Sequence, residues 1–394
     1  MSPGADAAGA RRSALVVALA AALLGACSGM PSLNPMDWFS APSGPKPAAL
    51  PALTAPQAVK QLWTARIGGA DAFVLSPALA GDSVYVAGRD GSVARLDPAT
   101  GQARWRGMAG IRISGGIGSD GELAVVASDL GEVVALDAKT GAPRWRARVS
   151  SEVLAAPRLA EGMVLVRSAD SRVFAFGAED GKRRWVYQRA PTSLIVRSPA
   201  GMTLHQGSAF AGFSGGKLVA LALTNGGVRW EATVALPKGA NELERVTDIV
   251  GDPAAQGREV CAAAFQGRVA CYDTHSGNQL WARDMSTLTG VSFDARYAYV
   301  SDEKGAVHAL DRSNGRSIWR QDRLGNRRLS QPLPLNAEIA LGDLEGWVHF
   351  LARDSGAFIA RHATDGSAIR AAPLRLPAGF LVQTASGGLF ALSL

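Results

Sequence analysis

The sequence contains few of the residues that build metal centres and nucleophilic active sites. Its 394 residues include only three cysteines and five histidines, and no two cysteines are adjacent. The histidines lie at least 13 residues apart, without the close spacing that zinc ligands need. We expect neither a nucleophile elbow nor a phosphate-binding loop in this chain. These absences predict a protein with no catalytic residue, no metal ion and no cofactor.

Long runs of one residue class are also missing. Charged residues make up 19% of the chain, and the formal net charge of +7 is scattered rather than gathered in one basic stretch. This distribution favours a solvated surface over nucleic-acid binding, although a basic face can attract acidic proteins or anionic lipid headgroups. Beyond residue 27 no apolar stretch reaches 18 residues, so no membrane-spanning helix is expected.

The N-terminus has the features of a bacterial lipoprotein signal. Arg11 and Arg12 precede a short apolar run over residues 13–24, which is too short to span a bilayer. The run ends in Leu-Gly-Ala-Cys, which resembles the lipobox, whose cysteine is acylated and becomes the new N-terminus. We therefore expect a signal peptide over 1–26 and a lipid anchor at Cys27. The alternative is a secreted protein with a chance cysteine.

The residues after the expected anchor bear on localisation and domain organisation. Ser28 follows the cysteine, and the lipobox resemblance then implies sorting to the outer membrane, with the body facing the periplasm. Seven prolines interrupt any regular element up to residue 56, so we expect 27–56 to be a semi-extended tether. Residues 57–394 are expected to form one domain.

A repeat of about 40 residues is the strongest signal in the chain. Each copy reads as an apolar segment, Asp, three residues, Gly, three residues and Trp, as in VARLDPATGQARW, which ends at Trp105. Glycine is abundant, with 45 residues, which suits many tight turns between short strands. Successive tryptophans are 42, 40, 40, 45, 51 and 38 residues apart. About 40 residues make one four-stranded blade of a β-propeller. The tryptophans of the repeat are Trp63, Trp105, Trp145, Trp185, Trp230, Trp281 and Trp319.

Each recurring residue of the repeat has a physical role. The Asp side chain can accept hydrogen bonds from nearby turn amides, and the Gly supplies a positive φ that ends the turn. The Trp opens the next strand and can fill the wedge between neighbouring blades. A degenerate eighth copy, FLARDSGAFIA, has Ala352, Gly356 and Ala360 at the three places.

The two ends of the repeat region set the blade count. Residues 387–392 form a third strand with no fourth strand after it, whereas 59–63 form a fourth strand with none before it. We expect the two to share one blade, because this closes the ring and removes exposed sheet edges. Counting third strands then gives an all-β, eight-bladed β-propeller. Seven blades remain the alternative if the divergent copy has lost regular structure.

Cys261 and Cys271 flank a predicted hairpin turn at Gln266-Gly267. If the register places them opposite each other, their Cβ atoms can approach disulfide distance. A two-residue loop would instead pair Cys261 with Tyr272 and put the thiols on opposite faces. Both outcomes, a disulfide and two separate buried thiols, remain open on the sequence.

The repeat resembles that of the pyrroloquinoline-quinone-dependent alcohol dehydrogenases, and that resemblance implies a quinone-binding enzyme as one hypothesis. Those enzymes carry a vicinal cysteine pair and a carboxylate-rich calcium site, and this sequence has neither. We therefore expect a protein that is not an enzyme.

The combination of a lipobox, a Pro-rich tether and a quinoprotein-like ring without a quinone site resembles the BamB family. This family supplies the propeller lipoprotein of the outer-membrane β-barrel assembly (BAM) machinery. The resemblance implies a non-enzymatic scaffold that binds BamA through its periplasmic domains and assists the folding and insertion of β-barrel proteins. Unfolded outer-membrane proteins are a further implied partner. The alternative is a generic propeller lipoprotein with another envelope partner.

The first long spacing in the repeat, 45 residues, contains a candidate binding loop. Ser-Leu-Ile-Val-Arg-Ser at 193–198 resembles a loop of the family that contacts BamA, with Leu194, Val196 and Arg197 in the matching places. Leucine, valine and arginine together also suit the centre of a protein interface. The alternative is that Leu194 and Val196 begin the first strand of a blade.

The second long spacing in the repeat, 51 residues, contains a second candidate binding loop. Residues 241–248 resemble the acidic loop of the family, and we expect Arg245 and Asp248 to bind the partner. Asp248 matches the first of two functional aspartates. Val250 replaces the second, and Asp252 is a candidate substitute two residues later.

Overall fold

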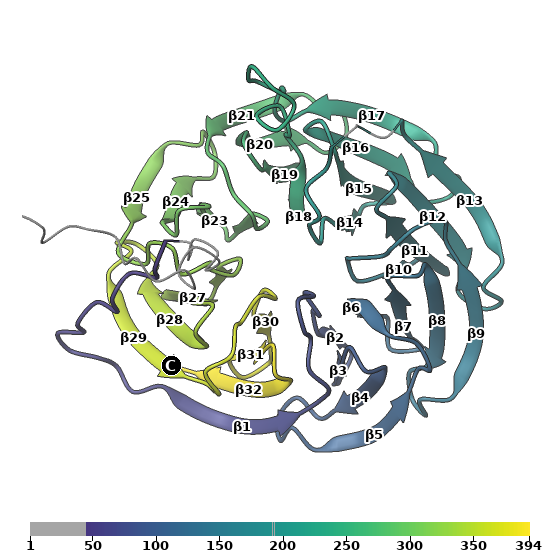
Figure 1. The fold of residues 1–394 in the computed structure, drawn as a ribbon, viewed down its shortest axis with the longest axis horizontal. Coiled ribbons are helices and arrows are strands. Elements are labelled where there is room, and N and C mark those ends of the chain that lie inside the picture. Colours follow the sequence, from purple (N-terminus) through teal and green to yellow (C-terminus); the bar gives the residue numbers. More distant parts are fainter. Residues whose placement is uncertain (1–44, 191, 193) are drawn as a thin grey trace, which may run out of the picture. The chain divides into compact units, whose positions relative to one another are not determined.

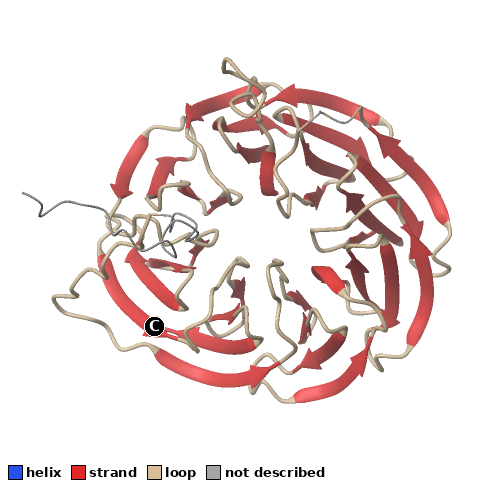
Figure 2. Ribbon diagram, viewed as in Figure 1, coloured by secondary structure: helices blue, strands red, loops and turns tan. Residues whose placement is uncertain are grey.

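Strands follow one another in groups of four around a ring (Figure 1). The computed structural model describes residues 45–190, 192 and 194–394, so the expected signal peptide and Cys27 lie outside the described residues. Within the described ranges every regular element is a strand (Figure 2), and no helix has the length and apolar character needed to cross a bilayer. Thirty-two strands in these ranges form eight four-stranded antiparallel sheets, which confirms the eight-bladed β-propeller.

The strands are numbered along the chain, and within each blade they run in order from the centre of the ring outwards (Figure 1). Blades 1 and 2 consist of β2 (Ala78–Ala80), β3 (Ser83–Ala87), β4 (Ser92–Leu96), β5 (Ala103–Met108), and β6 (Ile113–Ser119), β7 (Leu123–Ser128), β8 (Glu132–Asp137), β9 (Pro143–Arg148). Blades 3 and 4 consist of β10 (Arg158–Ala160), β11 (Met163–Ser168), β12 (Arg172–Gly177), β13 (Arg183–Gln188), and β14 (Met202–His205), β15 (Ser208–Phe213), β16 (Lys217–Ala222), β17 (Val228–Thr233).

Blades 5 to 8 complete the ring. Blades 5 and 6 consist of β18 (Ile249–Gln256), β19 (Glu259–Ala264), β20 (Arg268–Asp273), β21 (Gln279–Asp284), and β22 (Ser292–Phe293), β23 (Tyr297–Ser301), β24 (Val307–Asp311), β25 (Ser317–Gln321). Blades 7 and 8 consist of β26 (Leu333–Pro334), β27 (Glu338–Gly342), β28 (Trp347–Ala352), β29 (Phe358–Ala363), and β30 (Leu374–Arg375), β31 (Phe380–Gln383), β32 (Gly388–Ser393), β1 (Lys60–Arg66).

Blade 8 joins the two ends of the ring. Its outer strand β1 pairs antiparallel with β32, from Lys60 opposite Ser393 to Arg66 opposite Gly388. The expected closure is therefore confirmed. The degenerate copy around Gly356 also folds as regular strands, β28 and β29, so the seven-bladed alternative is wrong.

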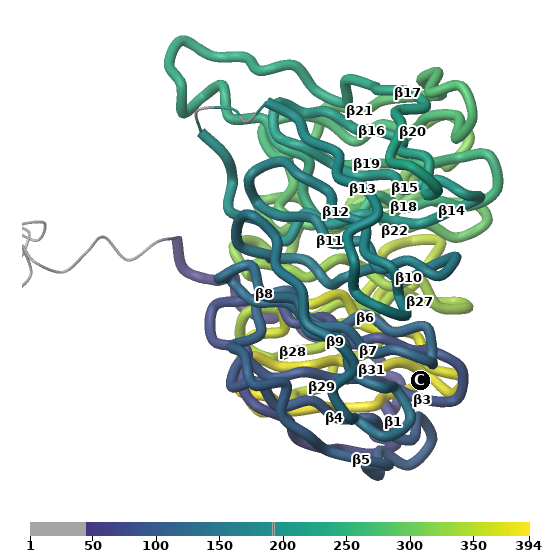
Figure 3. The backbone as a smooth tube through the Cα atoms, turned by 90° about the vertical axis from the view of Figure 1, so that its right-hand side faces the viewer, coloured from purple at the N-terminus to yellow at the C-terminus, as the bar shows by residue number. Residues whose placement is uncertain are grey.

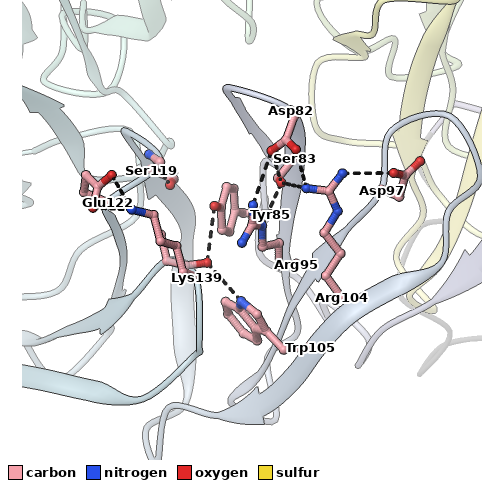
Figure 4. A network of polar contacts seen from close by, with 12 residues as sticks. Asp82, Ser83, Tyr85, Arg95, Asp97, Arg104, Trp105, Ser119, Glu122 and Lys139 are labelled. Atoms are coloured by element: carbon pink, nitrogen blue, oxygen red, sulfur yellow. Dashed lines mark hydrogen bonds and ion pairs between the residues drawn. The ribbon is translucent and has the colours of Figure 1, made fainter.

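The repeat turns have the expected geometry. In blade 1, Asp97 Oδ1 accepts hydrogen bonds from the backbone N–H groups of Ala99 (2.9 Å) and Thr100 (3.0 Å), and Gly101 has a φ of 71°. Arg104 joins this turn to the preceding hairpin, because its guanidinium pairs with both Asp97 and Asp82 (Figure 4). The Asp side chain therefore orders the turn that leads into the outer strand.

Each tryptophan of the repeat links its own blade to the next. Trp105 Nε1 donates a 2.9 Å hydrogen bond to the carbonyl of Ala138 in blade 2 (Figure 4). A Cβ at Gly141 would lie 2.8 Å from the Trp105 ring, so this glycine is needed both for its φ of 77° and for the ring that covers it. Equivalent Nε1 hydrogen bonds are made by Trp63, Trp145, Trp185, Trp230, Trp281 and Trp319.

The hydrophobic core is divided into separate clusters, as the fold is divided into blades. Eight buried apolar clusters occur in the described residues, and each lies between two adjacent blades. A blade therefore buries both of its faces against its neighbours, which accounts for strands such as β7 and β15 being buried at every position. Such packing makes a rigid ring whose variable parts are its connections.

The chain before β1 lies along blade 7 rather than apart from the ring. The compact unit spans Pro47–Leu394, so it starts ten residues before the expected boundary at residue 57. The carbonyl of Ala48 accepts a 2.7 Å hydrogen bond from Arg327, and that of Pro51 accepts one of 2.8 Å from Arg361. The last part of the expected tether thus packs on the propeller.

Cys261 and Cys271 form a disulfide in blade 5. The strands β19 and β20 pair these two residues directly, with Cα atoms 4.0 Å apart. Of the two outcomes that the sequence leaves open, the bonded one is present, because the hairpin is centred on Gln266 rather than on a two-residue loop.

Candidate functional site

Both long spacings in the repeat lie in connections between blades. The first lies between β13 and β14, and the second between β17 and β18. The second connection extends beyond the strands of the ring in Figure 3. Because β14 begins only at Met202, Leu194 and Val196 precede the first strand of blade 4, and the alternative that they form its start is wrong.

Asp248 joins the two connections. Its Oδ2 accepts a 2.6 Å hydrogen bond from the backbone N–H of Val196, and its Oδ1 accepts one of 3.1 Å from the N–H of Gly215. The residue is 4% exposed. Burial raises the pKa of its carboxyl above the ordinary value, while the two N–H donors oppose that rise. The carboxylate therefore faces the backbone of the neighbouring loop, and its visible role is to hold the two loops together.

The first loop presents a mixed apolar and cationic surface. Leu194 and Ile195 are 40% and 44% exposed, and Val196 is half-buried. Arg197 is exposed and pairs with Glu152 at 2.8 Å, while its guanidinium lies 5.2 Å from the centre of the Phe73 ring.

Phe73, in turn, lies between two arginines. Arg89 lies 4.1 Å from the centre of the same ring and forms a 2.5 Å ion pair with Asp129. Phe73 and Glu152 come from two further connections between blades, β1 to β2 and β9 to β10. Neither residue was predicted from the sequence, because only the closed ring brings these connections beside Arg197.

The second loop is braced by its own polar groups. The Glu244 carboxylate accepts hydrogen bonds from the N–H of Ala240 (2.7 Å) and from the Asn241 amide (3.0 Å), and the Glu244 N–H donates to Asn241 at 2.9 Å. The exposed Arg245 donates from Nε to the carbonyl of Gly239 at 3.0 Å. These bonds fix the loop and leave its apolar side chains outside.

Two leucines of this loop face solvent, and neither was predicted from the sequence as a functional residue. Leu236 is 65% exposed and Leu243 is 72% exposed. Both leucines lie in the same connection, and exposed apolar side chains that gather in one place mark interaction surfaces. Their place within the longer insertion was the available signal.

Val250 and Asp252 lie at, and two residues after, the place of the second family aspartate. Val250 is 1% exposed and lies in β18 opposite Ala263. The Asp252 carboxylate is paired with Arg158 of β10, two blades away along the ring. Asp252 therefore already has a cationic partner within the ring, and its role as a substitute carboxylate stays a prediction.

A small cavity of about 30 Å³ lies beneath the junction, lined by both loops and by Arg167. Burial lowers the pKa of Arg167 to about 10, while the nearby Asp248, Asp252 and Asp170 carboxylates oppose this shift. One guanidinium nitrogen of Arg167 donates to the carbonyl of Ala200 at 2.8 Å. Such a volume suits one or two waters, so this region presents a surface rather than a substrate pocket.

Among residues 45–190, 192 and 194–394, one grouping of potential metal ligands is present, namely Glu259, Cys261 and Cys271. Both sulfur atoms belong to the disulfide, so neither is available as a thiolate ligand.

Comparison with known proteins places the chain in a family. A family model described as outer membrane protein assembly factor BamB matches residues 89–321. The outer membrane protein assembly factor BamB of Bordetella pertussis is 42% identical over 87% of this chain and 89% of its own length. The crystal structure of BamB from Moraxella catarrhalis superposes with a TM-score of 0.79 at 27% identity, covering 86% of this chain and all of that one.

The fold is also shared with enzymes. The quinohemoprotein alcohol dehydrogenase of Comamonas testosteroni matches with a TM-score of 0.67 at 14% identity, covering 85% of this chain and 76% of that one. This second likeness concerns the fold alone. On the family match and the identity over most of both chains, the protein belongs to the BamB family of outer membrane protein assembly factors.

Proposed function

We propose that this chain is a non-enzymatic scaffold subunit of the outer-membrane protein assembly machinery that binds the periplasmic domains of BamA and assists β-barrel folding and insertion. Family membership supports the general role, since the curated relatives are named outer membrane protein assembly factors. The proposed binding site rests on one observation, the hydrogen bond from the Val196 N–H to Asp248, which holds two unusually long loops against each other.

The chemistry of the joined loops suits a protein partner. Leu194 offers an exposed apolar side chain in the same loop as the exposed Arg197, and the second loop adds Arg245. Partly exposed apolar side chains beside arginine form the energetic centre of many interfaces. In this proposal Asp248 positions the surface from below, and Leu194, Val196, Arg197 and Arg245 contact the partner.

The anchor forms a second part of the proposal. A signal peptide over 1–26, a lipid on Cys27 and a tether from there would hold the propeller at the outer membrane, facing the periplasm. Metabolic labelling with a palmitate analogue tests this, since labelling is expected in the wild type and should be lost in Cys27→Ser. Unfolded outer-membrane proteins are a further proposed partner.

Co-purification with BamA tests the binding site. Leu194→Asp and Arg197→Ala should each weaken recovery of BamA about tenfold or more, because interface centres of this kind contribute about 2 kcal/mol or more. Val228→Asp is the matched control, since Val228 is 53% exposed but lies on β17. Full recovery of BamA by both loop variants, with the fold intact, would refute the site.

A further inference from the structure

One wedge between blades departs from the repeat in its chemistry. The strand face that carries Trp281 in blade 5 meets the face that carries Leu310 in blade 6, and both residues belong to one buried cluster. Further out along the same wedge lies an open depression of about 600 Å³. Its lining includes Arg283 from β21 and His308 and Arg320 from blade 6.

The arginine on the blade 5 side stands where other blades have small or uncharged residues. Arg283 lies two positions after Trp281, so alternation along β21 places it on the same face as that tryptophan. The equivalent places after the other tryptophans are occupied by Ala65, Gly107, Ala147, Tyr187, Ala232 and Gln321. Within the part of the chain that the structure describes, the Arg283 guanidinium forms no ion pair or hydrogen bond.

The blade 6 side carries a histidine opposite an arginine, as blade 7 also does. Strand pairing places His308 directly opposite Arg320, so both side chains face blade 5. In blades 1 and 2 the matching arginines, Arg106 and Arg146, donate across the wedge to backbone carbonyls at 2.9 and 2.8 Å. Arg320 instead pairs at 2.8 Å with Asp322, two residues away, and its side chain is 51% exposed.

Arginines outnumber carboxylates in the lining of the depression, with Arg268, Arg283 and Arg320 against Asp284. Of the lining carboxylates in the described residues, Asp284 pairs with Arg268 at 3.3 Å, which leaves Arg283 without a counter-charge. His308 Nε2 contacts Asp302 Oδ2 at 2.9 Å, so this imidazole is already oriented at the edge of the depression. Ser317 adds a hydroxyl to the lining.

From this arrangement we infer that the wedge between blades 5 and 6 is a binding site for a phosphate group. Guanidinium groups from two facing walls can donate to several phosphate oxygens at once, and arginine suits phosphate geometry better than a point charge does. The depression is much larger than a phosphate ion, so it leaves room for the organic group that carries the phosphate. Free phosphate and a phospholipid headgroup share this chemistry.

Isothermal titration of the full chain with inorganic phosphate tests the site. Saturable binding is expected, and Arg283→Gln and Arg320→Gln should each weaken it about tenfold, the effect of losing one charge-assisted hydrogen bond. Arg183→Gln is the matched control, because Arg183 is an exposed arginine on β13 outside this wedge. Thermal unfolding of each variant monitors the fold.

The outcomes distinguish a specific phosphate site from general charge attraction. They also distinguish soluble phosphates from phospholipid headgroups as the ligand. Non-saturable binding, equal weakening by Arg183→Gln, or equally tight binding of acetate would overturn the inference. Co-sedimentation with phosphatidylglycerol vesicles identifies the source of the phosphate group. The protein in this assay carries Cys27→Ser, and phosphatidylcholine vesicles are the reference. Loss of vesicle binding in Arg283→Gln assigns the site to lipid headgroups, and unchanged vesicle binding assigns it to soluble phosphates.

Discussion

Asp248 accepts a 2.6 Å hydrogen bond from the backbone N–H of Val196, which lies 52 residues earlier in the chain. This bond ties together the two connections whose lengths depart most from the 40-residue repeat. Movement of either loop would break this bond and leave a buried carboxylate without its N–H donors, which is costly in free energy. The bond therefore fixes the backbones of both loops at this point. The surface formed by the loops is thus held by one side chain that does not itself face solvent.

Replacement of Asp248 should release the first loop. Asp248→Ala removes both acceptors of the Val196 and Gly215 N–H groups, and we expect a loss of about 1–3 kcal/mol in the free energy of unfolding. Hydrogen exchange at the Val196 amide should become faster. Exchange measured by mass spectrometry on peptides covering 192–200 checks this.

The control is Asp322→Ala, which removes an exposed carboxylate whose partner is Arg320. This variant should leave exchange over 192–200 unchanged. If Asp248→Ala also leaves it unchanged, the junction does not order the loop.

Much of the ring could be predicted because its repeat carries local chemistry. The Asp97 turn and the Trp105 wedge each depend on residues a few positions apart or on one neighbouring blade. The disulfide register could not be chosen in the same way. Gln266 adopts a φ of 46°, a conformation that is not expected for a glutamine. This turn sets the strand register so that Cys261 pairs with Cys271.

The candidate site was only partly predictable for a different reason. The insertions identified the loops, and Leu194 and Arg197 are exposed there as expected. The inward orientation of Asp248 and the stacking of Arg197 on Phe73 depend on loops from separate blades. Such contacts follow from ring closure, which a motif comparison does not describe.

A side chain at Gly201 should displace the Asp252 carboxylate. A Cβ there would overlap the Asp252 carboxylate, which is paired with Arg158. We expect Gly201→Ala to lower the free energy of unfolding by about 1–3 kcal/mol through overpacking. Gly107→Ala is the control, because a Cβ at Gly107 would meet its nearest neighbour at 4.0 Å. Urea unfolding of both variants decides the matter, and equal stability of the two would contradict the close packing of Gly201 against Asp252.

The repeat turns should lose stability in acid. The backbone N–H of Ser276 and further donors lower the pKa of Asp273 to about 2, against an ordinary value of 3.8. Because the folded pKa is depressed, the contribution of Asp273 to stability is present above pH 3.8 and is lost as the pH falls towards 2. Asp273→Asn keeps an acceptor but does not titrate.

Urea unfolding midpoints at about pH 5 and about pH 2.5 measure this contribution. The midpoint of the wild type should fall more between these pH values than that of Asp273→Asn. Parallel falls in the two proteins would show that the turn carboxylate does not contribute to acid sensitivity.

The disulfide in blade 5 should stabilise the ring measurably. Cys261 and Cys271 close a loop with a sequence separation of 10, for which restriction of the unfolded chain contributes about 2–3 kcal/mol. Reduction should therefore lower the unfolding midpoint of the wild type, while a Cys261→Ala/Cys271→Ala variant should be insensitive to reductant. A chain with Cys27→Ser, unfolded without reductant, should show no reactive thiol, because its two remaining cysteines are bonded. Two reactive thiols in that chain would mean that the pair is not oxidised, and the stabilisation would then have to come from packing of the buried sulfur atoms alone.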